Sequence, residues 1–132
     1  MKDPKKTPLK QLVAVKRKEY KQFGPVYCPI LKETVQFTFD GFEHLHVDGR
    51  KKRRPDGDAR ARLMLMSYAP GAIVGAKWLY TDKPKIVNGK IAQHYELVTR
   101  VGIYSTKVIV TIRKLGDGHT HFYGIRHARQ QK

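Results

Sequence analysis

The sequence is poor in cysteine and in acidic residues, and it lacks a long apolar run. Cys28 is the only cysteine in the 132-residue chain, which excludes an internal disulfide and a zinc site made of several cysteines. No stretch approaches the roughly 18 apolar residues of a membrane-spanning helix, and the charged residues 1–6 lead into no apolar signal core. The sequence therefore predicts a cytoplasmic, unprocessed protein, in which Cys28 is a small buried hydrophobe.

The shortage of acidic residues leaves a large positive charge. The chain has 27 Lys and Arg against 11 Asp and Glu, which gives a formal net charge of +16. Repulsion between these cations opposes folding, so a protein that keeps them is expected to bind a polyanion and release its counterions. This charge is typical of ribosomal proteins, nucleases and proteins that bind anionic membranes. We predict nucleic acid as the partner, with RNA favoured over DNA and no membrane.

Length and hydrophobic content predict one folded domain. With 132 residues, of which 40% are hydrophobic, the chain can bury a single core. Residues 1–8, which are basic and contain two prolines, are predicted to be a mobile tail, and residues 9–132 form the domain. A helix is expected at about 8–20, because apolar residues recur there near helical spacing while basic residues occupy the other faces.

The rest of the first half is predicted to contain one short strand followed by helices. Alternation of apolar and polar residues predicts the strand at 34–39. A helix is expected to begin at Asp40, where Glu43 completes the spacing of a capping box. Another helix is predicted from about 55 to 66, because a proline and aspartates precede it. A further helical turn is expected from Pro70.

Alternating β-branched and aromatic residues predict strands in the second half. Asn88-Gly89 is a two-residue hairpin signal, and residues 116–118 form a second turn. Strands joined by such short turns are antiparallel. The predicted fold class is α+β, with N-terminal helices packed on a four- to five-stranded antiparallel sheet that can include the early strand. The expected strands lie near 76–82, 91–101, 106–114 and 119–127.

One face of this sheet is predicted to carry polar side chains. Glu96 and Arg100 share one side of their strand, and His121 and Tyr123 share that face if the residue between them points into the core. These groups suffice for RNA cleavage without a metal, because a base activates the 2′-hydroxyl and an acid protonates the 5′-oxygen. Glu96 or His44 is the candidate base, and His121 is the candidate acid. The alternative is a noncatalytic face that stacks bases and binds phosphates.

A run of five basic residues, 50–54, lies between the helix carrying His44 and the next helix. We interpret it as a phosphate-binding clamp, with a solvated loop and a nuclear-import signal as the alternatives. Two His-x-His pairs, 44–46 and 119–121, lack the further ligands of a metal site, so no metal and no cofactor are predicted. The predicted nucleic-acid-binding residues are Arg50, Lys51, Lys52, Arg53, Arg54, Arg60, Arg62, Lys107 and Arg113.

The order of these elements and three short stretches resemble a known group of nucleases. The stretches are CPILKETVQFT leading to Gly41-x-x-His44, the basic loop with RARLMLMSYAP, and the final strand HTHFYGI. On them the chain resembles the barnase, EndoU, colicin and RelE-like nuclease superfamily, and within it the phage-associated branch of small nucleases. The resemblance covers residues 28–127.

The resemblance implies a curved antiparallel sheet, backed by helices, on which RNA is cleaved without metal to a 2′,3′-cyclic phosphate. It implies catalytic positions at His44 on the early helix and at His121 and Tyr123 on the final strand. A barnase-like base would be Glu96, with Arg100 near the phosphate, so Glu96 and His44 both stay open as the base. Several members of the superfamily are toxins restrained by a partner, some bind ribosomes, and some have lost catalysis. For this chain the expected partners are RNA, with ribosome-associated RNA and tRNA as candidates, and an acidic inhibitor protein.

Overall fold

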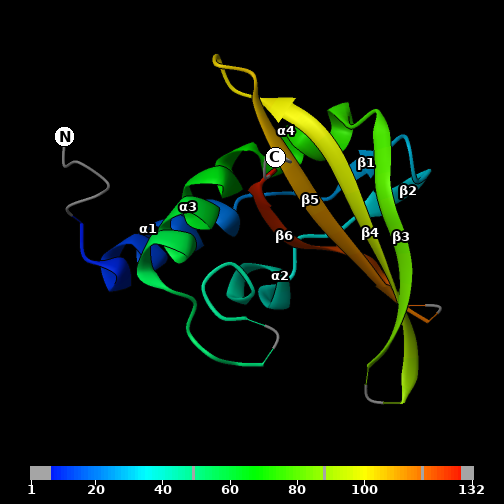
Figure 1. The fold of residues 1–132 in the computed structure, drawn as a ribbon, viewed down its shortest axis with the longest axis horizontal. Helices are drawn as coiled ribbons and strands as arrows, with labels where there is room; N and C mark the ends of the chain where they lie inside the picture. Colours follow the sequence, from blue (N-terminus) through cyan, green and yellow to red (C-terminus); the bar gives the residue numbers. More distant parts are fainter. Residues whose placement is uncertain (1–6, 49, 88, 117, 129–132) are drawn as a thin grey trace, which may run out of the picture.

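The main sheet has four antiparallel strands in the order β3-β4-β5-β6 (Figure 1). The computed structural model describes residues 7–48, 50–87, 89–116 and 118–128. The four predicted strands and the α+β class are confirmed. The strands are β3 (Trp78–Val87), β4 (Lys90–Val101), β5 (Thr106–Leu115) and β6 (Thr120–His127).

The helices come before these strands in the chain and lie on one side of the sheet (Figure 1). They are α1 (Leu9–Tyr20), α2 (Phe39–Glu43), α3 (Asp56–Leu65), the 3₁₀ helix η1 (Met66–Tyr68) and α4 (Ala69–Gly75). Apolar side chains from α1, α3 and α4 pack with Leu97, Val110 and Phe122 of the sheet in one core cluster. The opposite face of the sheet carries polar side chains such as Glu96 and Arg113 together with the apolar Ile109.

The early strand is shorter than predicted and does not extend the main sheet. β2 (Glu33–Val35) pairs with β1 (Val26–Cys28) in a separate two-stranded sheet. Just beyond β2, Gln36 forms an isolated parallel bridge with His121. The backbone of Gln36 donates to Thr120 at 2.9 Å and accepts from Phe122 at 2.8 Å. This bridge fastens the segment that leads into α2 to the edge of β6.

β3 continues to Val87, past its predicted end near residue 82. It can include a proline there because it is an edge strand. Pro84 lies within it, opposite Gln93 of β4. Proline lacks the backbone N–H that a central strand needs, but an edge strand tolerates it. Asn88 and Asp117 of the two predicted turns lie outside the described residues. The glycines beside them, Gly89 and Gly116, have φ of 77° and 52°, which suits glycine in such turns.

The start of the described chain contacts α3. Pro8 is the N-cap of α1, and the carbonyl oxygen of Thr7 accepts a hydrogen bond from Arg60. Residues 1–6 of the predicted mobile tail lie outside the described residues. Thr7 and Pro8, the last two residues of the predicted tail, are therefore part of the folded domain.

Candidate active site

Three polar residues form a row across β4, β5 and β6. His94 is the register partner of Arg113, and Arg113 is the partner of His121. The adjacent Ile112 and Phe122 belong to the core, and alternate residues of a strand point to opposite faces. The row therefore lies on the face of the sheet that turns away from the core, which is the face predicted for His121 and Arg113.

Tyr123 joins this row through a β-bulge in β6. The pairing of β5 with β6 shifts between Thr111 and Ile112, which leaves Tyr123 as an extra residue at the shift. A bulge changes the direction of nearby side chains. The guanidinium carbon of Arg113 lies 4.1 Å from the centre of the Tyr123 ring, which is a cation–π contact.

The C-terminal end of α2 brings His44 onto the same tyrosine. The rings of His44 and Tyr123 are stacked, with centroids 4.1 Å apart and planes 19° apart. Two glycines lie where α2 meets β6, and the one at position 41 is required for this approach. A Cβ on Gly124 would lie 3.4 Å from the His44 ring, and a Cβ on Gly41 would lie 2.1 Å from the carbonyl oxygen of Phe122. Helix α2 can lie this close to β6 because position 41 has no side chain.

Arg54, the last residue of the basic run, binds His44. Its Nε donates to the carbonyl oxygen of His44 at 2.9 Å, and its Nη2 lies 3.1 Å from the ring Nε2. A guanidinium can only donate, so Nε2 is the acceptor and the ring proton resides on Nδ1. Asp58 of α3 lies 3.8 Å from Arg54 and accepts from Arg62 at 2.8 Å, which places a second arginine beside the site.

The electrostatic surroundings keep His44 neutral. Burial of the ring, followed by the charges of Arg54, Arg62 and Arg113, lowers the pKa of His44 to about 4. Burial disfavours the charged imidazolium, and the nearby cations repel it. His44 is therefore unprotonated at neutral pH and able to accept a proton, although its low pKa makes it a weak base.

His121 is held as a neutral acceptor as well. Burial, followed by the charge of Arg113, lowers the pKa of His121. Arg113 Nε donates to His121 Nε2 at 3.0 Å, while Nδ1 lies 3.4 Å from the carbonyl oxygen of His119. Because Nε2 accepts this bond, it carries no proton for a leaving group. These contacts favour a role for His121 in orienting Arg113 over its predicted role as the acid.

Arg113 is a nearly buried cation with weak compensation. The residue is 8% exposed, and two of its contacts are with the Tyr123 ring and the neutral His121. Its ion pair with Asp40 is long, at 3.8 Å, and Asp40 is exposed. A buried charge is costly unless a close partner offsets it. A phosphate bound at this point would stabilise the site.

Asp40 has a different role from the predicted one. The N-cap of α2 is Thr38, and its side chain makes no capping hydrogen bond, so the predicted capping box is wrong. The helix begins one residue earlier than expected, which puts Asp40 in its first turn and directs its carboxylate toward Arg113.

No role was predicted for His94 from the sequence. Its position on the correct face of the sheet was predictable, because His94 alternates along β4 with the apolar residues of the core face.

Glu96 lies on the same face as the row but binds another partner. It is two residues along β4 from His94, and its register partner is Thr111. Its carboxylate accepts a hydrogen bond from Arg126 of β6 at 2.7 Å. Both candidate bases are therefore bound by an arginine, Glu96 by Arg126 and His44 by Arg54, but only His44 also contacts Tyr123.

Arg100 and Lys107 lie far along the sheet from His44. The two residues are register partners on β4 and β5, and Arg100 donates to the carbonyl oxygen of Ser105 at 2.9 Å. Arg100 is six residues from His94, which is roughly 20 Å at 3.3 Å per residue. The structure therefore does not bring Arg100 to the catalytic position that the resemblance implied.

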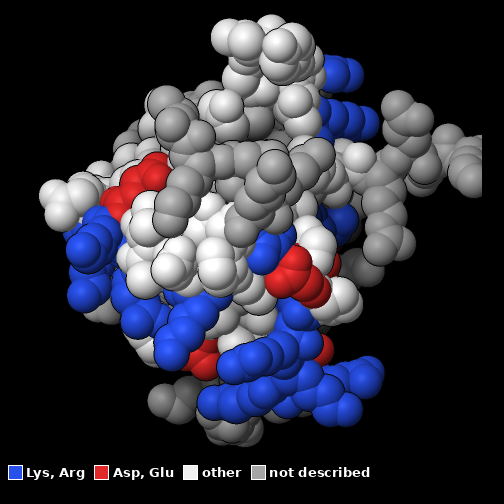
Figure 2. Space-filling model, turned by 90° about the vertical axis from the view of Figure 1, so that its left-hand side faces the viewer, with Lys and Arg blue, Asp and Glu red and all other residues white. Residues whose placement is uncertain are grey.

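The other predicted phosphate-binding residues differ in their exposure and in their contacts with the site. Figure 2, which views the molecule from the side of α1 and α3, shows broad patches of Lys and Arg beside smaller acidic ones. Within the basic run, Arg54 is half-buried against His44, whereas residues 50–53 are exposed. On α3, Arg62 lies near His44 and is bound by Asp58, whereas Arg60 is bound by Asp56 and Thr7.

No cluster of three or more potential metal-ligating side chains occurs in the part of the chain that the structure describes. Among those same residues, no helix is long and apolar enough to cross a membrane. Comparison of the chain with protein-family models, with curated proteins and with solved structures finds no match. The function must therefore be argued from the geometry of this site.

Proposed function

We propose that this protein is a metal-independent endoribonuclease that cleaves RNA by attack of a 2′-hydroxyl on the adjacent phosphate. The observation that carries the proposal is the contact of the Tyr123 ring with both the neutral His44 and the buried cation Arg113. These groups supply a proton acceptor, an O–H donor and a phosphate-binding charge. The net charge of +16 supports a polyanionic substrate, and the resemblance to the barnase, EndoU, colicin and RelE-like superfamily points to the same reaction.

The reaction would begin when a phosphate of RNA accepts hydrogen bonds from the N–H groups of Arg54 and Arg113. Arg54 then releases Nε2 of His44, which becomes free to accept the proton of the 2′-hydroxyl. The 2′-oxygen forms a bond to phosphorus as the bond between phosphorus and the 5′-oxygen breaks. The two arginines stabilise the negative charge on the other phosphoryl oxygens in the transition state.

Tyr123 is the proposed donor of the proton that the departing 5′-oxygen takes up. A phenol carries an O–H that can donate, and contacts with His44 and Arg113 fix this ring in the site. The products are a 2′,3′-cyclic phosphate and a 5′-hydroxyl. The proton on His44 is then lost to water, and Tyr123 regains one, so the enzyme returns to its starting state.

Cleavage of labelled RNA in excess EDTA tests the proposal directly. The pure protein is expected to cleave under these conditions, because the proposed mechanism uses no metal. It should leave 2′,3′-cyclic ends, because the attacking 2′-hydroxyl belongs to the substrate. Replacing that hydroxyl by hydrogen or O-methyl at the cleaved position should abolish the reaction. Cleavage of an all-deoxy strand would show that the mechanism is wrong.

Two substitutions of His121 separate an orienting role from that of the acid. His121→Ala removes the acceptor of Arg113 and is expected to lower kcat about tenfold to a hundredfold, since a misplaced catalytic group costs rate on this scale. His121→Gln offers a carbonyl oxygen to Arg113 and should restore most of the rate. If the glutamine variant is as inactive as the alanine variant, His121 transfers a proton and Tyr123 does not.

A noncatalytic RNA-binding protein is the second candidate function. It is favoured by the hydrogen bond that occupies Nε2 of His44 and by the pKa of about 4, both of which make His44 a poor base. On this alternative the two arginines hold phosphates without any proton transfer, while His44 and Arg113 stay on the two faces of the Tyr123 ring. Tight binding of RNA without cleavage would favour it over the nuclease.

A further inference from the structure

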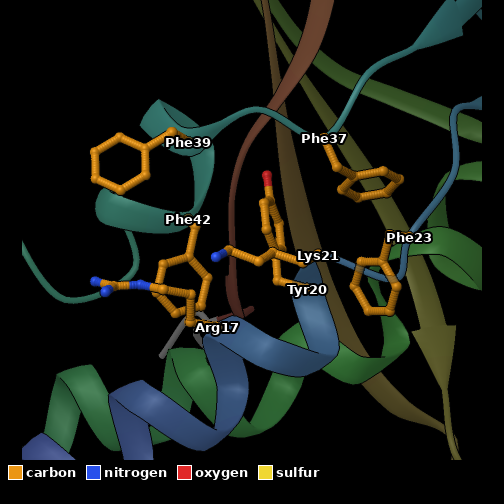
Figure 3. A pocket seen from close by; sticks show the side chains of 7 residues that line it. All are labelled: Arg17, Tyr20, Lys21, Phe23, Phe37, Phe39 and Phe42. Atoms are coloured by element: carbon orange, nitrogen blue, oxygen red, sulfur yellow. The ribbon is translucent and has the colours of Figure 1, made fainter.

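An aromatic pocket with two cations lies between the end of α1 and α2. Figure 3 shows it, and its volume is about 250 Å³. Phe23 and Phe37 line one end, with their rings at 67° and their centroids 5.2 Å apart. Phe39 and Phe42 line the other end. None of these residues takes part in the chemistry proposed above.

The cations of this pocket stand next to its aromatic rings. The guanidinium carbon of Arg17 lies 5.6 Å from the centre of the Phe42 ring. Lys21 also lines the pocket, and its side chain extends toward the side of the pocket where Phe42 lies (Figure 3). Arg17 on α1 and Lys21, the C-cap of α1, are both exposed, so each can bind an anion at this pocket.

Phe39 is unusual among these rings because it is 63% exposed. Phe42 and Tyr20 are buried and have packing roles in the core. Phe39 is not a member of that core cluster, so its ring has a free surface. An exposed aromatic ring beside cations is the arrangement with which proteins bind single-stranded nucleic acid, because bases stack on the ring and phosphates pair with the charges.

Helix α2 connects this pocket with the candidate active site. Phe39 and Phe42, three residues apart, line the pocket, whereas Asp40 and His44, four residues apart, contact Arg113 and Tyr123. Residues at these spacings share a side of a helix. The two sites therefore lie on two sides of one short helix, whose diameter with side chains is about 10 Å.

We propose that this pocket is a nucleotide-binding subsite for the RNA strand whose phosphate occupies the active site. In it a base stacks on Phe39, and the phosphate of that nucleotide pairs with Lys21 and Arg17. The inference rests on the proposed RNA substrate but requires no cleavage. A strand that crosses α2 would place the scissile phosphate at His44 and a nearby nucleotide in the pocket.

Binding of uncleavable 2′-O-methyl oligonucleotides to the full-length protein tests the subsite. Phe39→Ala should weaken the binding of a hexanucleotide about tenfold to a hundredfold, the usual effect of removing a stacking ring. Tyr104→Ala is the matched control, because Tyr104 is 87% exposed on the turn between β4 and β5, and it should leave affinity unchanged.

Two lysines at the end of α1 give a second readout. Lys21→Gln should lower the slope of log affinity against log salt by roughly 0.7, as expected for one lost phosphate contact on a single strand. Lys18→Gln removes the same charge from an exposed position outside the pocket and should change the slope less.

The outcomes of the binding and cleavage experiments are distinguishable. Lost affinity in Phe39→Ala and Lys21→Gln supports the subsite even if the wild type never cleaves RNA. Hexanucleotide affinities equal to those of the two controls overturn it even if the wild type is an active nuclease. A pocket that serves a protein partner would also give that second result.

Discussion

His44→Gln and Tyr123→Phe are each expected to lower kcat for RNA cleavage about 10²- to 10⁴-fold, the usual cost of losing a positioned acid or base. Glutamine can still accept the hydrogen bond of Arg54 but cannot take up the proton of the 2′-hydroxyl. Phenylalanine keeps the ring that Arg113 and His44 contact and lacks only the O–H. Affinity for uncleavable RNA should stay within a few-fold of wild type in both variants, since the arginines remain in place.

The pH dependence of kcat/KM gives an independent test of the base. A group that must be unprotonated gives the profile of kcat/KM against pH an acidic limb, along which kcat/KM falls as the pH decreases through the pKa of that group. Since the pKa of His44 is lowered to about 4, this limb should lie near pH 4 and not near the ordinary histidine value of roughly 6.5. His44→Gln should remove the limb from the residual activity, with folding confirmed by circular dichroism at each pH.

Glu96→Gln measured in parallel decides between the two candidate bases. If His44 is the base, Glu96→Gln keeps the acidic limb and most of the rate, because Glu96 is bound to Arg126. If Glu96→Gln loses the limb and His44→Gln keeps it, the assignment to His44 fails. A wild-type rate in Tyr123→Phe would likewise remove Tyr123 as the proton donor.

Most of the fold was predictable because its elements have clear periodicity. α1, α3 and β4 to β6 follow from helical or alternating spacing of apolar residues. The three-residue β1 is too short for such a pattern. The end of β3 at Val87 was not predictable, because Pro84 is typical of a strand end unless the strand is already known to be an edge strand.

The polar face was predictable in part, and the bulge at Tyr123 explains the remainder. Strict alternation along β6 groups His121, Tyr123 and Ile125 on one face. The structure buries Ile125 in the core instead, because the extra residue at the register shift reverses the alternation after it. A bulge of this kind has no signal in a single strand, since it depends on the pairing with Thr111 and Ile112 of β5.

The arginines of the site illustrate a second limit. Nothing in the run 50–54 distinguishes Arg54 from the exposed residues before it, because its burial depends on the folding of the loop back onto His44. Asp48 helps to form that loop by accepting backbone hydrogen bonds from residues 50 and 52, at 2.8 Å and 3.1 Å. Charge predicts the partner of such a run, but the tertiary contacts decide which residue serves the chemistry.

Gly41→Ala is expected to damage both stability and catalysis. An added Cβ would lie 2.1 Å from the carbonyl oxygen of Phe122 and 3.0 Å from the hydroxyl of Tyr20. The first of these is a backbone atom of β6 that cannot rotate away, so α2 must shift. Overpacking of this kind costs about 1–3 kcal/mol of unfolding free energy, which exceeds the gain of up to ~1 kcal/mol from alanine in a helix. Urea unfolding measures the difference.

Gly57→Ala is the matched control, because it makes the same change in α3, where a Cβ would meet nothing within 4 Å. It should leave stability unchanged or raise it by up to ~1 kcal/mol. In Gly41→Ala the shift of α2 also moves His44 away from Tyr123 and Arg54. A misplacement of about 1 Å can cost 10²-fold in rate, so cleavage should fall by about that factor even at temperatures where the variant stays folded. Wild-type stability and activity in Gly41→Ala would show that the approach of α2 to β6 does not hold His44 in place.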